Sequence, residues 1–319
     1  MKTTTKHIFM ISGILMAAGI VLTLIGISFG GWPGVSISRY GISSSSAQHE
    51  PFTLEKTEID AFSNLEIQMD TYADIQILPS EDEHFYLEYL LASHAEKPDY
   101  YVTDDSFVFR QHSISYASLS LGSIHSDPIN AYLALYIPVD CNLDQLKIDV
   151  ESCDLQIENI QAKSTEIHDN YGDIETKDSK LGTFDISLES GDFTARNMTT
   201  EQFSMKSEYG TVVFQDFSCD KQASFRMESG DLSLDATKLG SLSCKSEYGN
   251  ILLQLPEDPI TYSYDLTTEY GSIHLPFNAP IGYYSDDEDE VVYRTNTETG
   301  KEYRISIQTE SGDIRIQER

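Results

Sequence analysis

The amino-acid sequence predicts an all-β protein: a β-solenoid, or β-helix-like stack, of coils of about 19 residues, preceded by one N-terminal transmembrane helix. A short motif, Glu-Ser-Gly-Asp or Glu-Tyr-Gly-x, recurs at this period, which is the signature of a repeat architecture. Apolar and polar residues alternate on both sides of the motif's glycine, as they do in β-strands. The helix is predicted from a long uncharged run near the N-terminus.

The N-terminal segment has the composition of a membrane anchor. Residues 8–29 are 22 consecutive residues without a charge, and a helix of this length covers about 33 Å, enough to cross a bilayer. Lys2 and Lys6 precede the run, so the positive-inside rule places residues 1–7 in the cytoplasm. This predicts a single-pass protein of the cell membrane with residues 52–319 outside the cell. A cleaved signal peptide is the alternative, but its apolar region is usually only about 7–15 residues long.

The rest of the chain divides into a linker and three parts of one extracellular solenoid. Residues 30–51 contain several Gly and Ser residues and are expected to form a flexible linker. Residues 52–140 contain strands outside the strict period, and we expect them to cap the open end of the stack. Residues 141–275 carry the regular repeats. Residues 276–319 hold an acidic insertion, 286–290, and the closing coil.

The repeats place a glycine at each predicted corner of the coil. Apolar residues stand five positions before this glycine and two after it. The inward-facing residues therefore change from odd to even distances from the glycine at the corner. A strand can keep one face inward through such a change only if it bends there, and glycine accepts the positive φ that a bend requires. From Cys153 onward the corner positions are separated by 19, 19, 19, 20, 19, 22 and 41 residues. The predicted corner glycines are Gly172, Gly191, Gly210, Gly230, Gly249, Gly271 and Gly312.

These features together resemble a known family of exported bacterial proteins. The repeated motif, the closing stretch Tyr303–Ile314 and the N-terminal hydrophobic helix are similar to those of membrane-anchored β-strand-repeat proteins described as "putative adhesins". The resemblance covers residues 52–319 and implies a role in the bacterial cell envelope without an established ligand. This sequence differs from that pattern because it has Tyr before the corner glycine in alternate coils.

The tyrosines before the corner glycines are candidates for binding a partner. Tyr171, Tyr209, Tyr248 and Tyr270 occupy this position. A row of exposed aromatic rings would stack on sugar rings or on a partner protein. The other interpretation is that large Tyr and small Ser side chains alternate so that neighbouring corners can pack together. Along the chain, Tyr and Ser alternate up to Tyr248, and Tyr270 breaks the pattern.

The charge of the chain limits its ligands. There are 21 Lys+Arg against 52 Asp+Glu, a net charge of −31, which argues against nucleic acid as a partner. The glutamates of the motif form a ladder, which we interpret as a surface ion network with nearby Lys and Arg. The alternative is a calcium ion held between the Glu of one coil and the Asp of the next, for which the candidates are Glu189, Asp192, Glu228 and Asp231. We predict no other metal and no cofactor.

No catalytic residue is predicted, because the carboxylates follow the repeat instead of forming a distinct pair in a groove. The sequence therefore predicts a non-catalytic, membrane-anchored binding or scaffolding protein of the bacterial envelope. The expected partners are the membrane, through the N-terminal helix, and an envelope protein or a cell-surface glycan. An envelope-stress sensing or signalling accessory subunit is the alternative. A carbohydrate-active enzyme is a third hypothesis.

Overall fold

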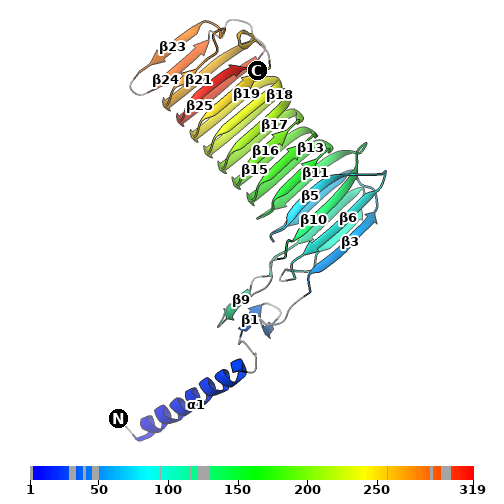
Figure 1. The fold of residues 1–319 in the computed structure, drawn as a ribbon, viewed down its shortest axis with the longest axis vertical. Helices are drawn as coiled ribbons and strands as arrows, with labels where there is room; N and C mark the ends of the chain where they lie inside the picture. The colour runs from blue at the N-terminus through cyan, green and yellow to red at the C-terminus, as the bar shows by residue number, and fades with distance from the viewer. Residues whose placement is uncertain are drawn as a thin grey trace. The chain divides into compact units, whose positions relative to one another are not determined.

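The computed structural model describes residues 3–28, 34–38, 41–44, 50–93, 95–114, 116–120, 129–256, 258–287, 290–295 and 303–319 (Figure 1). The chain divides into two units. Residues 1–50, 93–96 and 113–129 form the first unit, and the remaining residues form the second. The candidate site lies in the second unit.

The first unit contains one helix and a small sheet. Its elements are α1 (Thr3–Ser28), β1 (Gly34–Ser38), β2 (Gly41–Ser44) and β9 (Tyr116–Ser120). Strand β1 pairs in antiparallel fashion with both β2 and β9. Two short strands therefore fall inside residues 30–51, which the composition predicts as a linker. Residues 30–33, 39–40 and 45–49 of that linker lie outside the described residues.

The predicted single-pass membrane topology is wrong. Within the described residues, no helix combines the length and the apolar character that crossing a membrane requires. The anchor predicted over residues 8–29, and the cell-membrane location that depends on it, are therefore not supported.

The second unit is one large, nearly closed, barrel-like sheet of 23 strands, so the predicted all-β class is confirmed. Its N-terminal strands are β3 (Phe52–Ile59), β4 (Asn64–Met69), β5 (Asp74–Ser80), β6 (Phe85–Leu91), β7 (Asp99–Thr103), β8 (Ser106–Gln111) and β10 (Tyr132–Pro138). Its middle strands are β11 (Asn142–Val150), β12 (Leu155–Glu158), β13 (Gln161–Tyr171), β14 (Ile174–Lys177), β15 (Lys180–Ser190), β16 (Phe193–Arg196), β17 (Thr199–Tyr209), β18 (Val212–Ser229), β19 (Leu232–Tyr248) and β20 (Ile251–Leu255). Its C-terminal elements are the 3-10 helix η1 (Pro259–Thr261) and strands β21 (Tyr262–Tyr270), β22 (Ile273–His274), β23 (Gly282–Asp286), β24 (Val291–Thr295), β25 (Tyr303–Ser311) and β26 (Ile314–Glu318).

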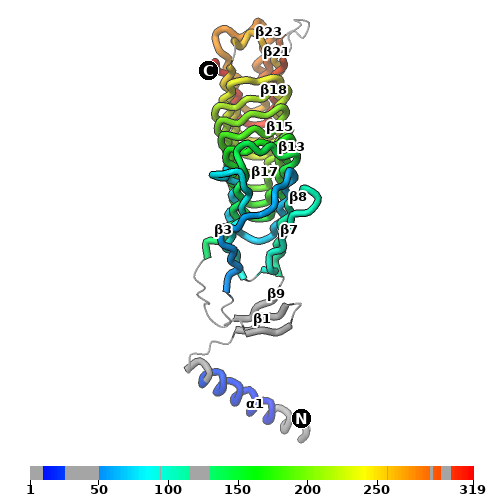
Figure 2. The backbone as a smooth tube through the Cα atoms, turned by 90° about the vertical axis from the view of Figure 1, so that its right-hand side faces the viewer, coloured from blue at the N-terminus to red at the C-terminus, as the bar shows by residue number. Residues whose placement is uncertain are grey.

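The repeats stack in parallel, one coil on the next. In the ladder of long strands, Ile148 pairs with Ile167, and Ile167 pairs with Ile186, so each partner lies one repeat further along the chain. The short strands form a second parallel ladder with the same step, in which Leu155 pairs with Ile174. We call one long strand and the short strand after it a coil. Figure 2 shows successive coils following one another along the second unit.

The N-terminal strands begin the stack. Strand β4 pairs with β11 and strand β5 pairs with β12, both in parallel, so residues 64–80 form the coil next to the regular repeats. Beyond them the pattern changes, because β10 pairs in antiparallel fashion with β6, and β7 does so with β8. The antiparallel strands at this end interrupt the parallel stacking of the coils.

At the other end, the order of the coils in space differs from their order in the chain. Strand β25 pairs with β19 on one side and with β21 on the other. Strand β26 likewise lies between β20 and β22. The last coil of the chain is therefore inserted between two coils that precede it, as the sequence of labels β19, β25 and β21 in Figure 1 shows. Strands β24 and β23 then continue the sheet beyond β21 in antiparallel fashion.

The core consists of the inward positions of both ladders. Residues five before and two after each corner position are buried, as the alternation predicts. Aromatic rings fill the middle of the stack: the centroid of Phe203 lies 5.4 Å from that of Phe184, 5.2 Å from that of Phe214 and 5.3 Å from that of Phe225. Rings in contact at such distances add to the stability that their burial provides.

The glycine corners follow from how closely the coils stack. Five of the seven predicted corner glycines, the exceptions being Gly172 and Gly271, have φ between +134° and +145°. A Cβ on Gly172 would lie 2.2 Å from the carbonyl oxygen of Cys153, and a Cβ on Gly271 would lie 2.1 Å from that of Gly312. Glycine is therefore required at these two corners by contact with the neighbouring coil, and not by positive φ.

Candidate binding surface

Exposed tyrosines line the glycine corners of the stack. Tyr171, Tyr209, Tyr248 and Tyr270 are the last residues of β13, β17, β19 and β21, and we call them the tyrosine row. Their exposed fractions are 60%, 58%, 55% and 72%. Strict alternation would bury Tyr171, because Asp169 two residues earlier is fully buried. The bend at the corner glycine exposes it instead.

Tyrosine and serine alternate without a break along the row. Tyr171 pairs with Ser190, which pairs with Tyr209 in the next coil. The row then continues through Ser229, Tyr248, Ser311 and Tyr270. The insertion of β25 places Ser311 between the last two tyrosines, which removes the break that the chain order shows at Tyr270. Tyr72, 59% exposed, stands at the same position of the motif in the first coil, although it is not among the tyrosines predicted to bind a partner.

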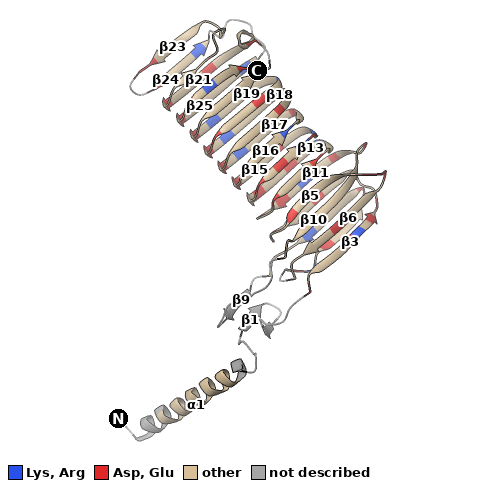
Figure 3. Cartoon of the chain, viewed as in Figure 1, with Lys and Arg blue, Asp and Glu red and all other residues tan. Residues whose placement is uncertain are grey.

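Carboxylates border the tyrosine row on both sides. The residue before each Tyr or Ser of the row is a glutamate in all coils from β15 onward, and several coils also have an aspartate just after the corner glycine. Figure 3 shows acidic positions at the tips of successive long strands, with basic positions further back on the strands. The glutamates are Glu189, Glu208, Glu228, Glu247, Glu269 and Glu310. A partner that reaches the row therefore meets negative charge on either side of it.

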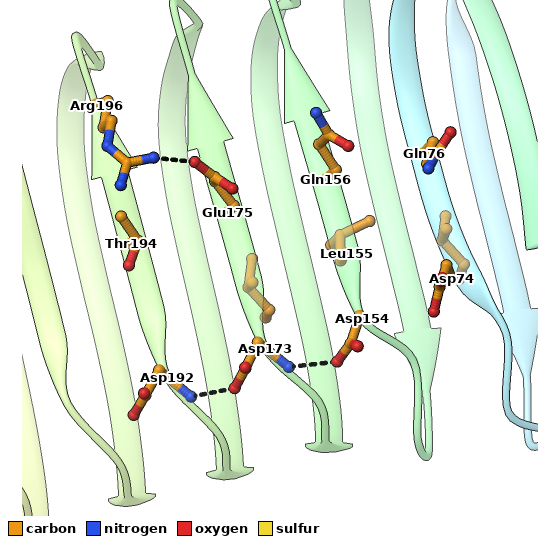
Figure 4. A pocket seen from close by; sticks show the side chains of 12 residues that line it. Asp74, Gln76, Asp154, Leu155, Gln156, Asp173, Glu175, Asp192, Thr194 and Arg196 are labelled. Carbon is orange, nitrogen blue, oxygen red and sulfur yellow. Dashed lines mark hydrogen bonds and ion pairs between the residues drawn. The ribbon is translucent and has the colours of Figure 1, made fainter.

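The aspartates after the corner glycines hold neighbouring coils together. The backbone N–H of Asp173 donates to Oδ1 of Asp154 at 3.0 Å, and that of Asp192 donates to Oδ1 of Asp173 at 2.8 Å (Figure 4). The same bond recurs from Thr211 to Asp192 at 2.7 Å and from Asn250 to Asp231 at 2.7 Å. These side chains satisfy backbone donors that the turn leaves without a ladder partner.

The four calcium candidates do not form one site. Glu189 and Asp192 belong to one corner, while Glu228 and Asp231 belong to a corner two coils away. Two coil steps are about 9.6 Å, whereas two ligands on one calcium ion, each at about 2.3–2.6 Å, lie no more than about 5 Å apart. Within the described residues, no group of three or more His, Cys, Asp or Glu side chains is placed to hold a metal ion.

Two shallow depressions lie on the ladders beside the corners. One, of about 410 Å³, is lined by the aspartates of Figure 4 and by the ion pair between Arg196 and Glu175. The other, of about 590 Å³, contains Lys206, Arg226 and Lys245, which stand in register on neighbouring long strands. The Nζ atom of Lys206 lies 3.0 Å from Oε1 of Glu208, as the predicted ion network requires. Both depressions mix charges of opposite sign.

Asp169 is a buried carboxyl beneath the first corners. It has no exposed surface, and burial raises its pKa to about 7. The backbone N–H of Tyr171 donates to its Oδ1 at 3.2 Å, which opposes the rise, while Oδ2 has no hydrogen-bond partner among the described residues. Other coils have Leu188, Ser207 or Met227 at the corresponding position. Asp169 therefore departs from the repeat, and the negative charge of Asp154 in the preceding coil adds to the rise in its pKa.

The fold and the corner define an acidic all-β protein of stacked repeats. The chain belongs to the Toastrack DUF4097 family, whose model matches residues 62–317. The resemblance to bacterial β-repeat "putative adhesins" is thereby confirmed. No curated protein matches the chain.

The chain is similar to several solved structures, three of which come from Parabacteroides distasonis and Bacteroides fragilis. A "putative adhesin" from Parabacteroides distasonis is 12% identical, with 85% of this chain and 95% of that one covered and a TM-score of 0.44. A "putative adhesin" from Bacteroides fragilis is 12% identical, with 84% and 98% covered and a TM-score of 0.36. A "putative lipid binding protein" from Parabacteroides distasonis is 15% identical, with 84% and 97% covered and a TM-score of 0.41.

Proposed function

We propose that this chain is a non-catalytic, adhesin-like binding protein: a β-solenoid whose tyrosine row is its contact surface. The observation that carries the proposal is the exposure of the row. If alternating bulk served only to pack neighbouring corners, the rings would be covered by the adjacent coils, yet each tyrosine of the row is at least 55% exposed. Exposed tyrosines contribute little to folding, whereas tyrosine is enriched at binding hot spots because one large ring offers apolar area and a hydroxyl.

The stack makes this surface rigid. Each tyrosine is the last residue of a long strand that is paired with a neighbouring strand on both sides; at the end of the row, β21 has β25 on one side and the antiparallel strand β24 on the other. A contact surface that is ordered before binding loses less conformational entropy on association than a flexible one. The surrounding carboxylates disfavour anionic partners and favour neutral or basic ones.

A photo-crosslinking amino acid placed in the full chain tests the proposal. Incorporated at position 209 or 248 and activated in cells, it should give discrete adducts, because these positions lie in the proposed contact surface. The matched control is position 283, since Tyr283 is 64% exposed but lies on β23, outside the row. Adducts at 209 and 248 that do not form at 283 would support the proposal. Their absence, or the same adducts at all three positions, would overturn it.

A further inference from the structure

The tyrosine row has a regular spacing that limits which polymers match it. Neighbouring strands lie about 4.8 Å apart, and tyrosines occur at every second coil, so they recur about every 9.6 Å. From Tyr171 to Tyr270 there are six coil steps, or about 29 Å. The serine between each two tyrosines leaves a gap in the row, and the gaps have the same spacing. A linear partner would use the whole row only if its own repeat matched the spacing of the tyrosines.

The regular peptide conformations can be compared with this spacing directly. Side chains on one face of a β-strand recur about every 6.6–6.8 Å, and one turn of an α-helix rises about 5.4 Å. A polyproline II helix has three residues per turn and rises about 3.1 Å per residue, so every third side chain returns to the same face after about 9.3 Å. The mismatch with the row is about 0.3 Å per turn, and about 1 Å over its length.

The charges around the row indicate which side chains those third residues would carry. Glu208, Glu247 and Glu269 precede Tyr209, Tyr248 and Tyr270, whereas Asn170 precedes Tyr171, so three of the four tyrosines of the row have a glutamate as their neighbour in the chain. A Lys or Arg side chain over a tyrosine ring is attracted by the ring's quadrupole, and the adjacent carboxylate adds an ion pair. The net charge of −31 favours a basic partner further.

We propose that the tyrosine row binds a basic peptide segment in the polyproline II conformation, with Lys or Arg at every third position. Aromatic surfaces are a recurring means of recognising this conformation, because the peptide is already extended and loses little entropy on binding. The inference rests on the proposed function, since it names the partner of the same surface. An amine-bearing glycan is a different partner that carries positive charge on a linear chain, and the experiment distinguishes the two.

The test compares two peptides of identical composition on the full chain. Both have fifteen residues, five Lys and ten Pro; in one, Lys occurs at every third position, and in the other Lys occupies alternate positions of the first nine residues. Both adopt polyproline II, so only the spacing of the charges differs. The peptide with Lys at every third position should bind more tightly in fluorescence anisotropy at physiological salt. Equal affinities would overturn the inference.

Variants of the row then separate ring contacts from general charge attraction. Tyr209→Ser combined with Tyr248→Ser removes two rings and should weaken the matched peptide by about 5- to 30-fold, while the other peptide changes little. Tyr283→Ser combined with Tyr284→Ser is the control, since these tyrosines are also exposed, at 64% and 52%, but lie on β23. Equal losses in both double variants would overturn the inference.

A further variant tests the spacing itself. Ser229→Tyr adds a ring but fills one gap, so it should weaken the matched peptide; tighter binding would show that aromatic area alone matters and would overturn the inference. A chitosan oligomer that binds through Tyr209 and Tyr248 when neither peptide does would replace the peptide with an amino-glycan and leave the proposed function intact. By contrast, the same photo-crosslinked adducts at positions 209, 248 and 283 would overturn the proposed function itself. Circular dichroism confirms that each variant is folded.

Discussion

Replacing Asp169 by Asn should stabilise the protein, and by more at pH 8 than at pH 5. The wild-type carboxyl is fully buried, and its Oδ2 atom has no hydrogen-bond partner among the described residues. Ionisation there leaves a charge in a poorly solvated position, which is why burial raises the pKa to about 7. Asn has nearly the same shape, and its carbonyl oxygen can accept the hydrogen bond from the backbone N–H of Tyr171.

The sign and size of the effect follow from linkage. Below about pH 3.8 the carboxyl is protonated in the folded and the unfolded chain, so it does not affect stability. Between pH 3.8 and about 7 the folded state keeps a proton that the unfolded state has lost, so stability falls as pH rises. Above pH 7 the cost reaches (7 − 3.8) × 1.36, or about 4 kcal/mol at most; at pH 5 it is about 2 kcal/mol.

Urea unfolding followed by far-UV circular dichroism at the two pH values measures this difference. The gain in unfolding free energy of Asp169→Asn over wild type should be about 2–3 kcal/mol larger at pH 8 than at pH 5. Asp173→Asn is the matched control, because Asp173 is an exposed corner residue only four positions away and Asn keeps its acceptor oxygen. A gain that is the same at both pH values, or a loss of stability at pH 8, would refute the reasoning.

Three further predictions concern the corners and the thiols. Gly210→Ala would put a Cβ 1.9 Å from a backbone oxygen at a φ of +136°, so the loss of stability should exceed about 4 kcal/mol and be visible as a fall in melting temperature and soluble yield. Asp192→Ala removes the acceptor for the Thr211 N–H and should lower the free energy of unfolding in urea by about 1 kcal/mol. The melting temperature of the wild type should be the same in chelator and in millimolar Ca²⁺. Burial raises the pKa of the Cys244 thiol to about 12, so Cys244 should react with Ellman's reagent only after unfolding, whereas the partly exposed Cys141 reacts first; equal rates would contradict this.

The period and the buried positions of the stack could be predicted because each repeat presents the same local problem. A residue such as Ile167 is apolar at a fixed distance from the corner, and its burial follows from alternation alone. The same logic placed the glycines at the corners. It did not reveal why Gly172 must be glycine, because that depends on the carbonyl of Cys153 in the adjacent coil, which the chain pattern does not show.

A second corner is also marked in the sequence, by Asn and Asp residues in place of glycine. Asn159, Asp178, Asn197 and Asp216 recur once in each of four successive coils and have φ of +56°, +51°, +50° and +55°. Asn and Asp are the residues other than glycine that most readily adopt this left-handed conformation, so their period alone could have located the corner between each short strand and the next long strand.

The order of the final coils could not be predicted from the sequence. The pattern leaves nearly two periods between Gly271 and Gly312, which suggests a missing corner. The structure instead places the coil of Gly312 between those of Gly249 and Gly271. Parallel pairing is equally compatible with either order, because every coil presents similar apolar residues to its neighbours. The continuous alternation of the tyrosine row becomes visible only once this order is known.

The corner aspartates show that the negative charge of this surface exceeds what the fold requires. Asn250 accepts the N–H of Asp313 through Oδ1 at 3.0 Å, just as Asp173 accepts that of Asp192 at 2.8 Å. The hydrogen bond therefore needs an oxygen acceptor and not a charge. Carboxylates stacked about 4.8 Å apart in water repel each other by about 0.9 kcal/mol per pair before screening by salt. Since an amide would serve folding at a lower electrostatic cost, the retained charge supports a role outside the fold, namely the selection of a basic partner at the tyrosine row.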